Sequence, residues 1–324
     1  MAWADRAAPW VISWGLWVGG AWAQPYPTQP IRIVVAYPAG GGADSLTRAM
    51  APRLGELLGQ QIVVDNRPGG NTVIGTQLAA ISKPDGYTLL AADSAYMTNP
   101  FLLDKLPYDT LRDFAPVVLL TASHTILVVH PSLPVKTVNE LVALARSRPG
   151  QLNYASGGNG NTTHLIGELL NSVAKIKIVH IPYKGSAPAI TDIVAGQVTI
   201  AFNGIFAVKS LVDSGRLRAI AIASPGRKPA MPQVPTFAQF GWPAIDATAY
   251  RGLVAPAGTP RDIIGRLNAE LNSALSDADW RAKFVTSAGI TPSGSTPEWF
   301  DQYIARDREG FSALTKSLGV KAPG

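Results

Sequence analysis

The chain has 324 residues, of which 47% are hydrophobic and 15% charged, so it can bury a large core and is not disordered as a whole. Lys and Arg exceed Asp and Glu by 28 to 22, a net charge of +6, but no dense basic stripe accompanies this excess, so nucleic-acid binding is not supported. The chain has no cysteine, which excludes disulfides, thiolate metal ligands and a cysteine nucleophile. Its four histidines lack the close spacing of a zinc site, and we expect no metal.

The first residues are typical of a secretory signal peptide. Arg6 precedes an apolar run from Pro9 to Gly20, and Ala21-Trp22-Ala23 matches the pattern that signal peptidase cleaves. The alternative is an uncleaved membrane anchor, but the run is shorter than the roughly 20 residues that a membrane span requires. We therefore predict a signal peptide at residues 1–23, a mature chain that begins at Gln24, and a periplasmic location.

Strands and helices alternate along the rest of the chain. The first third predicts a strand at 31–36, a helix that Asp44 or Ser45 caps and Pro52 kinks or splits, a strand at 61–65, a helix at 73–81 and a strand at 87–92. Further strands are predicted at 117–120, 125–129, 152–155, 176–181, 198–202, 217–223 and 250–255, and further helices at 138–146, 163–173, 187–195, 260–275, 277–288 and 296–318. This alternation with short connections implies parallel sheets covered by helices.

Two glycine-rich loops each join a predicted strand to a predicted helix. They span residues 37–43 and 156–162, and neither contains the Gly-Lys-Ser/Thr of a P-loop or the dinucleotide pattern G-x-G-x-x-G. Two similar α/β lobes that face one another would form a cleft with a helix N-terminus on each wall. Because a helix N-terminus offers free N–H donors and a partial positive charge, the loops predict a site for a carboxylate or a phosphate.

Several longer segments are similar to a known family. They are YPAGGGAD (37–44), DNRPGGNTVIG (65–75), PDGYTLL (84–90), HIPYKGSAPAITDIVAGQV (180–198), GRLRAIA (215–221) and LVAPAGTP (253–260). In this order they resemble the solute-binding proteins of tripartite tricarboxylate transporters, the Bug or TctC family, over essentially the whole mature chain. The resemblance implies an α/β fold of the type II-like periplasmic binding proteins, in which two lobes, each a largely parallel sheet flanked by helices, close on a ligand in the cleft between them. We expect lobe 1 at residues 24–124 and 228–324, and lobe 2 at residues 125–227.

The resemblance also implies that backbone amides, hydroxyls and water hold the carboxylate of a small organic acid. The candidate ligand-binding residues are Tyr37, Ala39, Gly40, Gly41, Asp93, Ser94, Ser156, Gly158, Asn159, Gly160, Asn161, Thr162, His164, Asn203, Tyr250 and Arg251. His164 can instead be a histidine that packs in a helix, and both interpretations stay open. Asp44 also matches the first loop, where helix capping is the role we favour.

Three of these positions depart from the family pattern. Asp93 replaces a neutral polar residue, Asn203 replaces an aspartate, and Arg251 replaces one of two aromatic residues before a glycine. The loss of a carboxylate at Asn203 argues against a ligand ammonium group, and Arg251 could bind a second ligand carboxylate. Asp93 could bind a cation or pair with Arg251, and Arg251 could instead lie on the surface, pointing away from the cleft.

The sequence predicts a receptor and not an enzyme. It contains no G-x-S-x-G motif, and Ser156 with His164 has no evident acidic third member, so a periplasmic hydrolase ranks low. We expect a monomer without a cofactor that captures a small mono- or dicarboxylate, aliphatic or aromatic, for the membrane subunits of a tripartite transporter. The alternative is a protein that presents the same ligand to a periplasmic sensor kinase, and the sequence does not separate these two roles.

Overall fold

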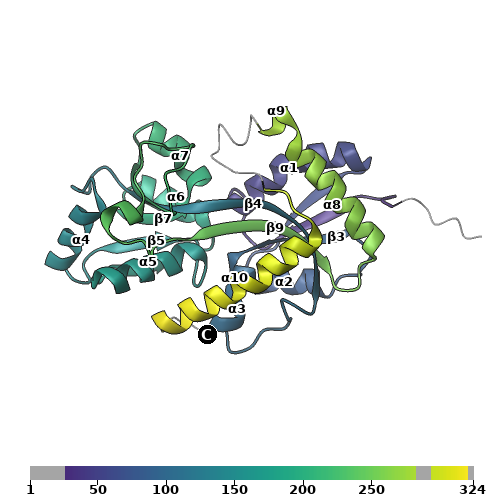
Figure 1. Ribbon diagram of the computed structural model, residues 1–324, viewed down its shortest axis with the longest axis horizontal. Coiled ribbons are helices and arrows are strands. Elements are labelled where there is room, and N and C mark those ends of the chain that lie inside the picture. Colours follow the sequence, from purple (N-terminus) through teal and green to yellow (C-terminus); the bar gives the residue numbers. More distant parts are fainter. Residues whose placement is uncertain (1–25, 282–292, 320–324) are drawn as a thin grey trace, which may run out of the picture.

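The computed structural model describes residues 26–281 and 293–319, which form two lobes joined by shared strands (Figure 1). The predicted signal peptide and most of the helix predicted at 277–288 lie outside the described residues; of that helix, α9 (Ala278–Arg281) is described. Where the chain is described, no helix is both long enough and apolar enough to cross a membrane.

The first lobe is built on three parallel strands in the order β2, β1, β3. They are β1 (Ile31–Val35), β2 (Ile62–Asn66) and β3 (Thr88–Asp93), close to the predicted ranges. The helices α1 (Gly42–Leu58) and α8 (Arg261–Ser276) cover one face, and α2 (Val73–Ala80), α3 (Ser94–Leu102) and α10 (Pro297–Leu318) cover the other. Both faces are therefore buried, which explains why β1 is apolar and β-branched at almost every position.

The second lobe repeats this plan with the parallel order β6, β5, β7. Its strands are β5 (Asn153–Ser156), β6 (Val179–Pro182), β7 (Ile200–Gly204) and β8 (Arg218–Ala223). The helices α4 (Val138–Ser147) and α5 (Thr162–Ala174) pack on one face, and α6 (Ser186–Val194) and α7 (Ile205–Asp213) pack on the other.

Two long antiparallel strands connect the lobes. β4 (Phe114–Val129) pairs with β9 (Thr248–Pro256) as far as His124, and from Thr125 onward with β7 and β8. Both strands run from one lobe into the other in Figure 1. The prediction of two separate strands at 117–120 and 125–129 was therefore wrong. The polar residues between them, among which Thr121 and Ser123 are buried, continue the strand through the junction. The two-lobed α/β fold is confirmed, and the junction strands make its sheet mixed.

The segment before β9 packs on the second lobe. Met231 and Val234 join the apolar cluster of α6 and α7, and Phe237 and Ile245 join the cluster of α4 and α5. A 3-10 helix, η1 (Phe237–Phe240), lies in this segment. We therefore propose that the chain leaves the second lobe where β9 begins and not near residue 227.

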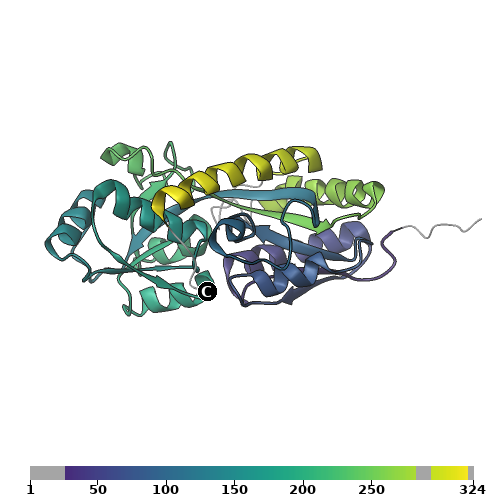
Figure 2. The same ribbon diagram turned by 90° about the horizontal axis from the view of Figure 1, so that it is seen from below.

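Helix α10 lies along both lobes (Figure 2). It packs against α3 and β4 in the first lobe and reaches α5 in the second. Leu165 of α5 belongs to the same buried cluster as Phe300 and Ile304 of α10. The last helix therefore packs across the junction between the lobes.

The helices differ from the predictions in three places. Pro52 does not split α1, which is one helix with Met50 and Leu54 buried on either side of the proline. The helices α3 and α7 were not predicted. Seven of the nine residues of α3 are buried, so its sequence shows no polar face that would mark a helical period.

Candidate functional site

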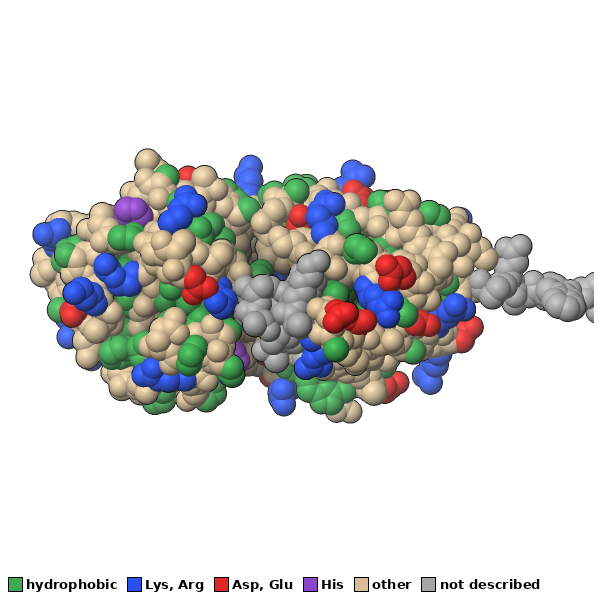
Figure 3. All heavy atoms as spheres, turned by 90° about the horizontal axis from the view of Figure 1, so that it is seen from above, with side chains coloured by type: hydrophobic (Ala, Val, Ile, Leu, Met, Phe, Trp, Pro, Cys, Tyr) green, Lys and Arg blue, Asp and Glu red, His purple; other side chains and the backbone are tan. Residues whose placement is uncertain are grey.

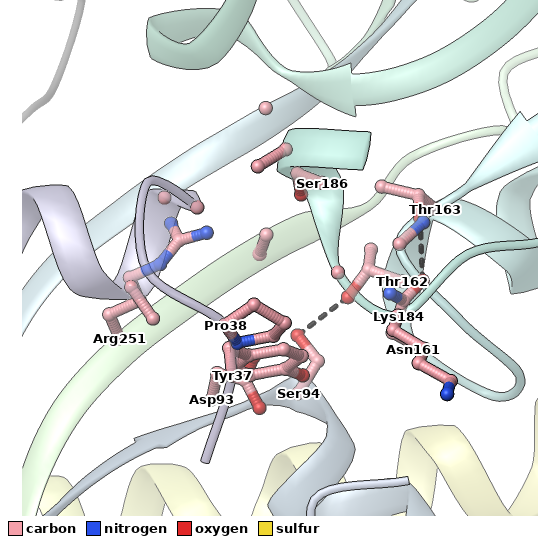
Figure 4. A pocket seen from close by; sticks show the side chains of 18 of the residues that line it. Tyr37, Pro38, Asp93, Ser94, Asn161, Thr162, Thr163, Lys184, Ser186 and Arg251 are labelled. Carbon is pink, nitrogen blue, oxygen red and sulfur yellow. Dashed lines mark hydrogen bonds between the residues drawn. The ribbon is translucent and has the colours of Figure 1, made fainter. Parts of the chain in front are cut away.

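The N-termini of five helices converge on one cavity between the lobes. They belong to α1 and α3 from the first lobe and to α5, α6 and α7 from the second. The cavity encloses about 630 Å³ of space, counting its open mouth. Its lining residues are Tyr37, Pro38, Gly41, Gly42, Ala43, Asp93, Ser94, Gly157, Asn161, Thr162, Thr163, Lys184, Gly185, Ser186, Ala187, Gly204, Ala249, Tyr250 and Arg251. Figure 4 shows the labelled side chains around this space.

Three of these helices begin without a side-chain cap. The N-cap residues of α1, α6 and α7 are Gly41, Gly185 and Gly204, and none of the described side chains accepts a capping hydrogen bond at these ends. Each end thus has first-turn N–H groups without an intrahelical acceptor, and a partial positive charge of roughly half a unit. Three such ends around one cavity favour an anionic ligand.

The other two N-termini are capped by their own side chains. Asp93 accepts a hydrogen bond from the backbone N–H of Ala95 at 3.0 Å, and Asn161 accepts one from that of His164 at 3.1 Å. The N-cap of α1 differs from our expectation, because Asp44 does not occupy it. Asp44 lies in the first turn, where its carboxylate accepts hydrogen bonds from the Gly40 N–H at 2.9 Å and from Arg48 Nε at 2.9 Å.

One carboxylate, Asp93, lines the cavity, and protein groups already occupy it. It accepts a hydrogen bond from the Ala95 N–H, and the Tyr96 N–H and the Tyr37 hydroxyl are close enough to lower its pKa. Burial raises the pKa of Asp93, and these hydrogen bonds and the Arg251 charge oppose that rise. Asp93 also raises the pKa of Tyr37 beyond the rise that burial causes, so the Tyr37 hydroxyl stays protonated and donates.

Arg251 lines the cavity and does not point away to the surface. Its guanidinium carbon lies 4.6 Å from the ring centroid of Phe206 in α7. Burial lowers the pKa of Arg251, and the Asp93 charge partly restores it. Among the described residues, no carboxylate oxygen lies within 4.0 Å of the guanidinium, and the buried Nε has no hydrogen-bond partner.

The second glycine-rich loop, at residues 156–162, contacts the first lobe. Thr162 donates a hydrogen bond to the Ser94 hydroxyl at 2.6 Å, which joins the N-terminus of α5 to that of α3 (Figure 4). Gly160 lies against Leu102 at the end of α3. The loop therefore closes one side of the cavity by direct contact between the lobes.

Two stacked histidines support this loop from behind. The rings of His164 and His180 are 3.9 Å apart, and burial lowers their pKa values to about 4 and about 3, so both are neutral near pH 7. His164 Nδ1 accepts a hydrogen bond from the Gly160 N–H at 2.9 Å, and His180 Nε2 lies 2.6 Å from the Ser156 hydroxyl. Ser156 is fully buried, so the serine and the histidines fix the loop and do not face the cavity.

The structure brings half of the candidate residues together around the cavity. These are Tyr37, Gly41, Asp93, Ser94, Asn161, Thr162, Tyr250 and Arg251. Gly158 and Asn159 line a neighbouring hollow that shares Tyr37, Pro38 and Lys184 with the cavity. Ala39, Gly40, Ser156, Gly160, His164 and Asn203 are not among the lining residues, and the last of these is fully buried with both side-chain amide atoms unpaired in the described structure.

Sequence reasoning missed the wall formed by residues 184–187 and by Gly204. Lys184-Gly185-Ser186 repeats the pattern of the other two loops, a strand followed by glycine and a small polar residue at a helix start. The same reasoning would therefore have identified it. Gly204 gave no such signal, because α7 was not predicted.

Within residues 26–281 and 293–319, no group of three or more His, Asp or Glu side chains is placed to hold a metal ion. On the face shown in Figure 3, Lys and Arg side chains are scattered among acidic and uncharged ones.

Two lobes, a shared pair of strands and a cavity of helix N-termini define a periplasmic binding protein of the solute-receptor class. Residues 46–320 match the tripartite tricarboxylate transporter family receptor, and the chain belongs to this family. Protein BugT of Bordetella pertussis is 36% identical over 301 residues, which cover 92% of each chain.

Solved structures of similar proteins agree. A structure described as R. palustris Rpa4515 with adipate has a TM-score of 0.89 and 31% identity, and the match covers 92% of this chain and 100% of that one. MatC from Rhodopseudomonas palustris with bound malate has a TM-score of 0.84 and 28% identity, and covers 89% and 99%. The predicted family is confirmed.

Proposed function

We propose that this protein is a periplasmic receptor, without catalytic activity, that captures a small organic carboxylate between its lobes for a tripartite transporter. The observation that supports this most strongly is the convergence of three glycine-capped helix N-termini on one cavity. Similar proteins bind adipate and malate, which are carboxylates. The ligand-binding residues that we propose are the lining residues of this cavity.

The arrangement supports binding through closure. The ligand carboxylate accepts hydrogen bonds from N–H groups of both lobes, so a bound anion favours the form in which α1 and α6 approach one another. The hydroxyls of Ser94 and Thr162 already join the lobes and lie on the cavity wall. The closed form then offers a surface that the membrane subunits of the transporter recognise, and binding energy drives a hinge motion and no chemical step.

The direct test is a ligand screen on protein expressed from the full-length gene and purified from the periplasm. Mass spectrometry of the purified chain tests export, with Gln24 expected as the first residue. Thermal unfolding is then measured with aliphatic carboxylates, aromatic acids, amino acids, sugars and divalent cations. A ligand that binds only the native state at about 100 times its Kd stabilises it by about 2.7 kcal/mol.

The outcomes separate the proposal from its competitors. A rise in melting temperature with acids and not with sugars supports the carboxylate cleft. A rise with sugars or cations alone would overturn it, and turnover of a bound acid would contradict a receptor without catalysis. Sedimentation of the purified protein tests the expected monomer.

A further inference from the structure

The cavity contains a positive charge, Arg251, that forms no ion pair with any of the described residues. The Arg251 guanidinium stacks on Phe206, its buried Nε has no partner, and no described carboxylate lies within ion-pair distance. Arg251 is partly buried, and a charge withdrawn from water without a partner is destabilising, because its desolvation is not compensated. The cation is therefore poised for an anion that is not part of the described protein.

The position of Arg251 strengthens this conclusion. A Cβ atom built on Gly42 would lie 2.9 Å from Arg251 Nη2, so the guanidinium is close to the first residue of α1. The N-terminus of α1 is uncapped and carries partial positive charge. A cation beside the positive end of a helix is unfavourable unless an anion lies near both.

Asp93 does not supply that anion. It lies opposite Arg251 in the register of β3 and β9, but its carboxylate caps α3 by accepting the Ala95 N–H and forms no ion pair with Arg251 within 4.0 Å. Asp93 and Arg251 therefore differ in their capacity to bind a charged group of the ligand. Asp93 already caps a helix, whereas the Arg251 guanidinium retains donors for a ligand anion.

Arg251 is also a contact between the lobes. It comes from β9, whereas Phe206 belongs to α7 in the second lobe and packs at the same time on the α1–α8 core of the first. An anion at Arg251 would therefore lie between α1 and the N-terminus of α7, whose cap is Gly204. This place is separate from the α5 and α6 N-termini, which form the other part of the wall.

We infer that Arg251, with the N-terminus of α1, binds a second carboxylate of the ligand and makes the receptor selective for dicarboxylates over monocarboxylates and zwitterions. The inference rests on the proposed function, in which the first carboxylate accepts hydrogen bonds from N–H groups of both lobes. A guanidinium can donate two parallel hydrogen bonds to one carboxylate, which an aromatic residue at this position cannot do.

Matched pairs of acids test this inference. Isothermal titration compares succinate with butyrate, glutarate with valerate, and adipate with hexanoate, each pair having one chain length and differing in one carboxylate. Glutamate serves as the zwitterionic counterpart of glutarate. The dicarboxylate of the best-fitting length is expected to bind about 10- to 100-fold more tightly than its monocarboxylate, the usual effect of one charge-assisted hydrogen-bond pair.

Variants separate this role from a structural one. Arg251→Gln is expected to remove the preference for the second carboxylate and to leave monocarboxylate affinity within about threefold, and Arg251→Lys to retain part of the preference because the charge remains. Arg216→Gln removes one positive charge from an exposed position in the second lobe and is expected to change neither affinity. If Arg251→Gln fails to fold, the comparison rests on Arg251→Lys.

Each outcome decides between the two proposals. Equal affinity for both members of every pair, or an unchanged preference in Arg251→Gln, would overturn the role of Arg251 while the receptor function stands. Equal losses of mono- and dicarboxylate affinity in Arg251→Gln would make the arginine structural and overturn the role as well. If no acid of either series binds the wild type, the proposed function itself fails.

Discussion

Replacing Gly160 with alanine should weaken ligand binding, in addition to a smaller loss of stability that the open and closed forms share. Gly160 has a φ of +72° and belongs to the second lobe, and a Cβ atom at this position would lie 1.7 Å from Leu102 Cδ1 in the first lobe. Carbon atoms in contact are about 3.5–4.0 Å apart, so Leu102 or the whole loop must move by about 2 Å. Leu102 is only 4% exposed, which leaves little room for that movement.

The expected magnitude follows from these contacts. Overpacking of this kind costs about 1–3 kcal/mol, and it arises only when the lobes touch. Opening the cleft relieves it, so the cost appears in ligand affinity as a Kd about 5- to 150-fold higher. The left-handed backbone strain of the new alanine, about 1 kcal/mol, is present in open and closed forms alike and lowers the melting temperature without affecting binding.

Gly215 provides a matched control. Its φ is +73°, and a Cβ atom there would have no neighbour within 4 Å. Gly215→Ala should therefore lower the melting temperature of the unliganded protein as much as Gly160→Ala does, and leave affinity unchanged. The double variant Gly160→Ala with Leu102→Ala should regain binding relative to Gly160→Ala. Equal affinity of the two glycine variants, or no recovery in the double variant, would refute the reasoning that this contact limits closure.

Three further predictions concern the polar groups around the cavity. Burial lowers the pKa values of His164 and His180 to about 4 and about 3, so below pH 6.5 the unfolded state binds more protons than the folded state. The free energy of unfolding should therefore fall from pH 6.5 to pH 4, by on the order of 3 kcal/mol for His164 alone. Denaturant titrations at several pH values measure this fall, and its absence would contradict the buried neutral pair. Asn161→Ala should cost about 1 kcal/mol of stability because α5 loses its cap, and an unchanged midpoint in urea would show that the cap contributes nothing. Asn203→Leu should raise stability by about 1 kcal/mol because it removes two buried unpaired amide atoms, whereas a loss of ligand affinity in this variant would place Asn203 in the binding machinery after all.

The sequence predicted the parts of the site that have a local signature. The loops before α1 and α5 each follow a short strand and precede a run with helical spacing, and each lies on the cavity wall. The fold class followed from the same alternation and from the family resemblance. The position of Arg251 could not be read locally, because strand β9 places it beside α1 only through pairing with β3.

The parts that sequence reasoning missed are set by tertiary structure. Helix α3 is buried on nearly all sides and contains Pro100, so neither period nor composition marks it as a helix. The polar residues Thr121 and Ser123 in the middle of β4 give a sequence pattern that is typical of a loop. In the structure they are buried where the lobes join. Local polarity normally ends a strand, and here the pairing with β9 overrides it.

The shared strand β4 has a consequence for how the chain folds. Phe114 pairs with Pro256, so the first lobe is completed only after the whole second lobe has been traversed, whereas the partners of β4 in the second lobe all lie between Ile200 and Ala223. Pairings across long stretches of chain form slowly, because the entropy of closing a long loop is lost before the contacts form. The second lobe should thus acquire protection from hydrogen exchange first, with the sheet of the first lobe closing around β9 as the late step. Until that step, β3 presents an unpaired edge, which makes a slowly folding chain vulnerable to association with other copies of itself.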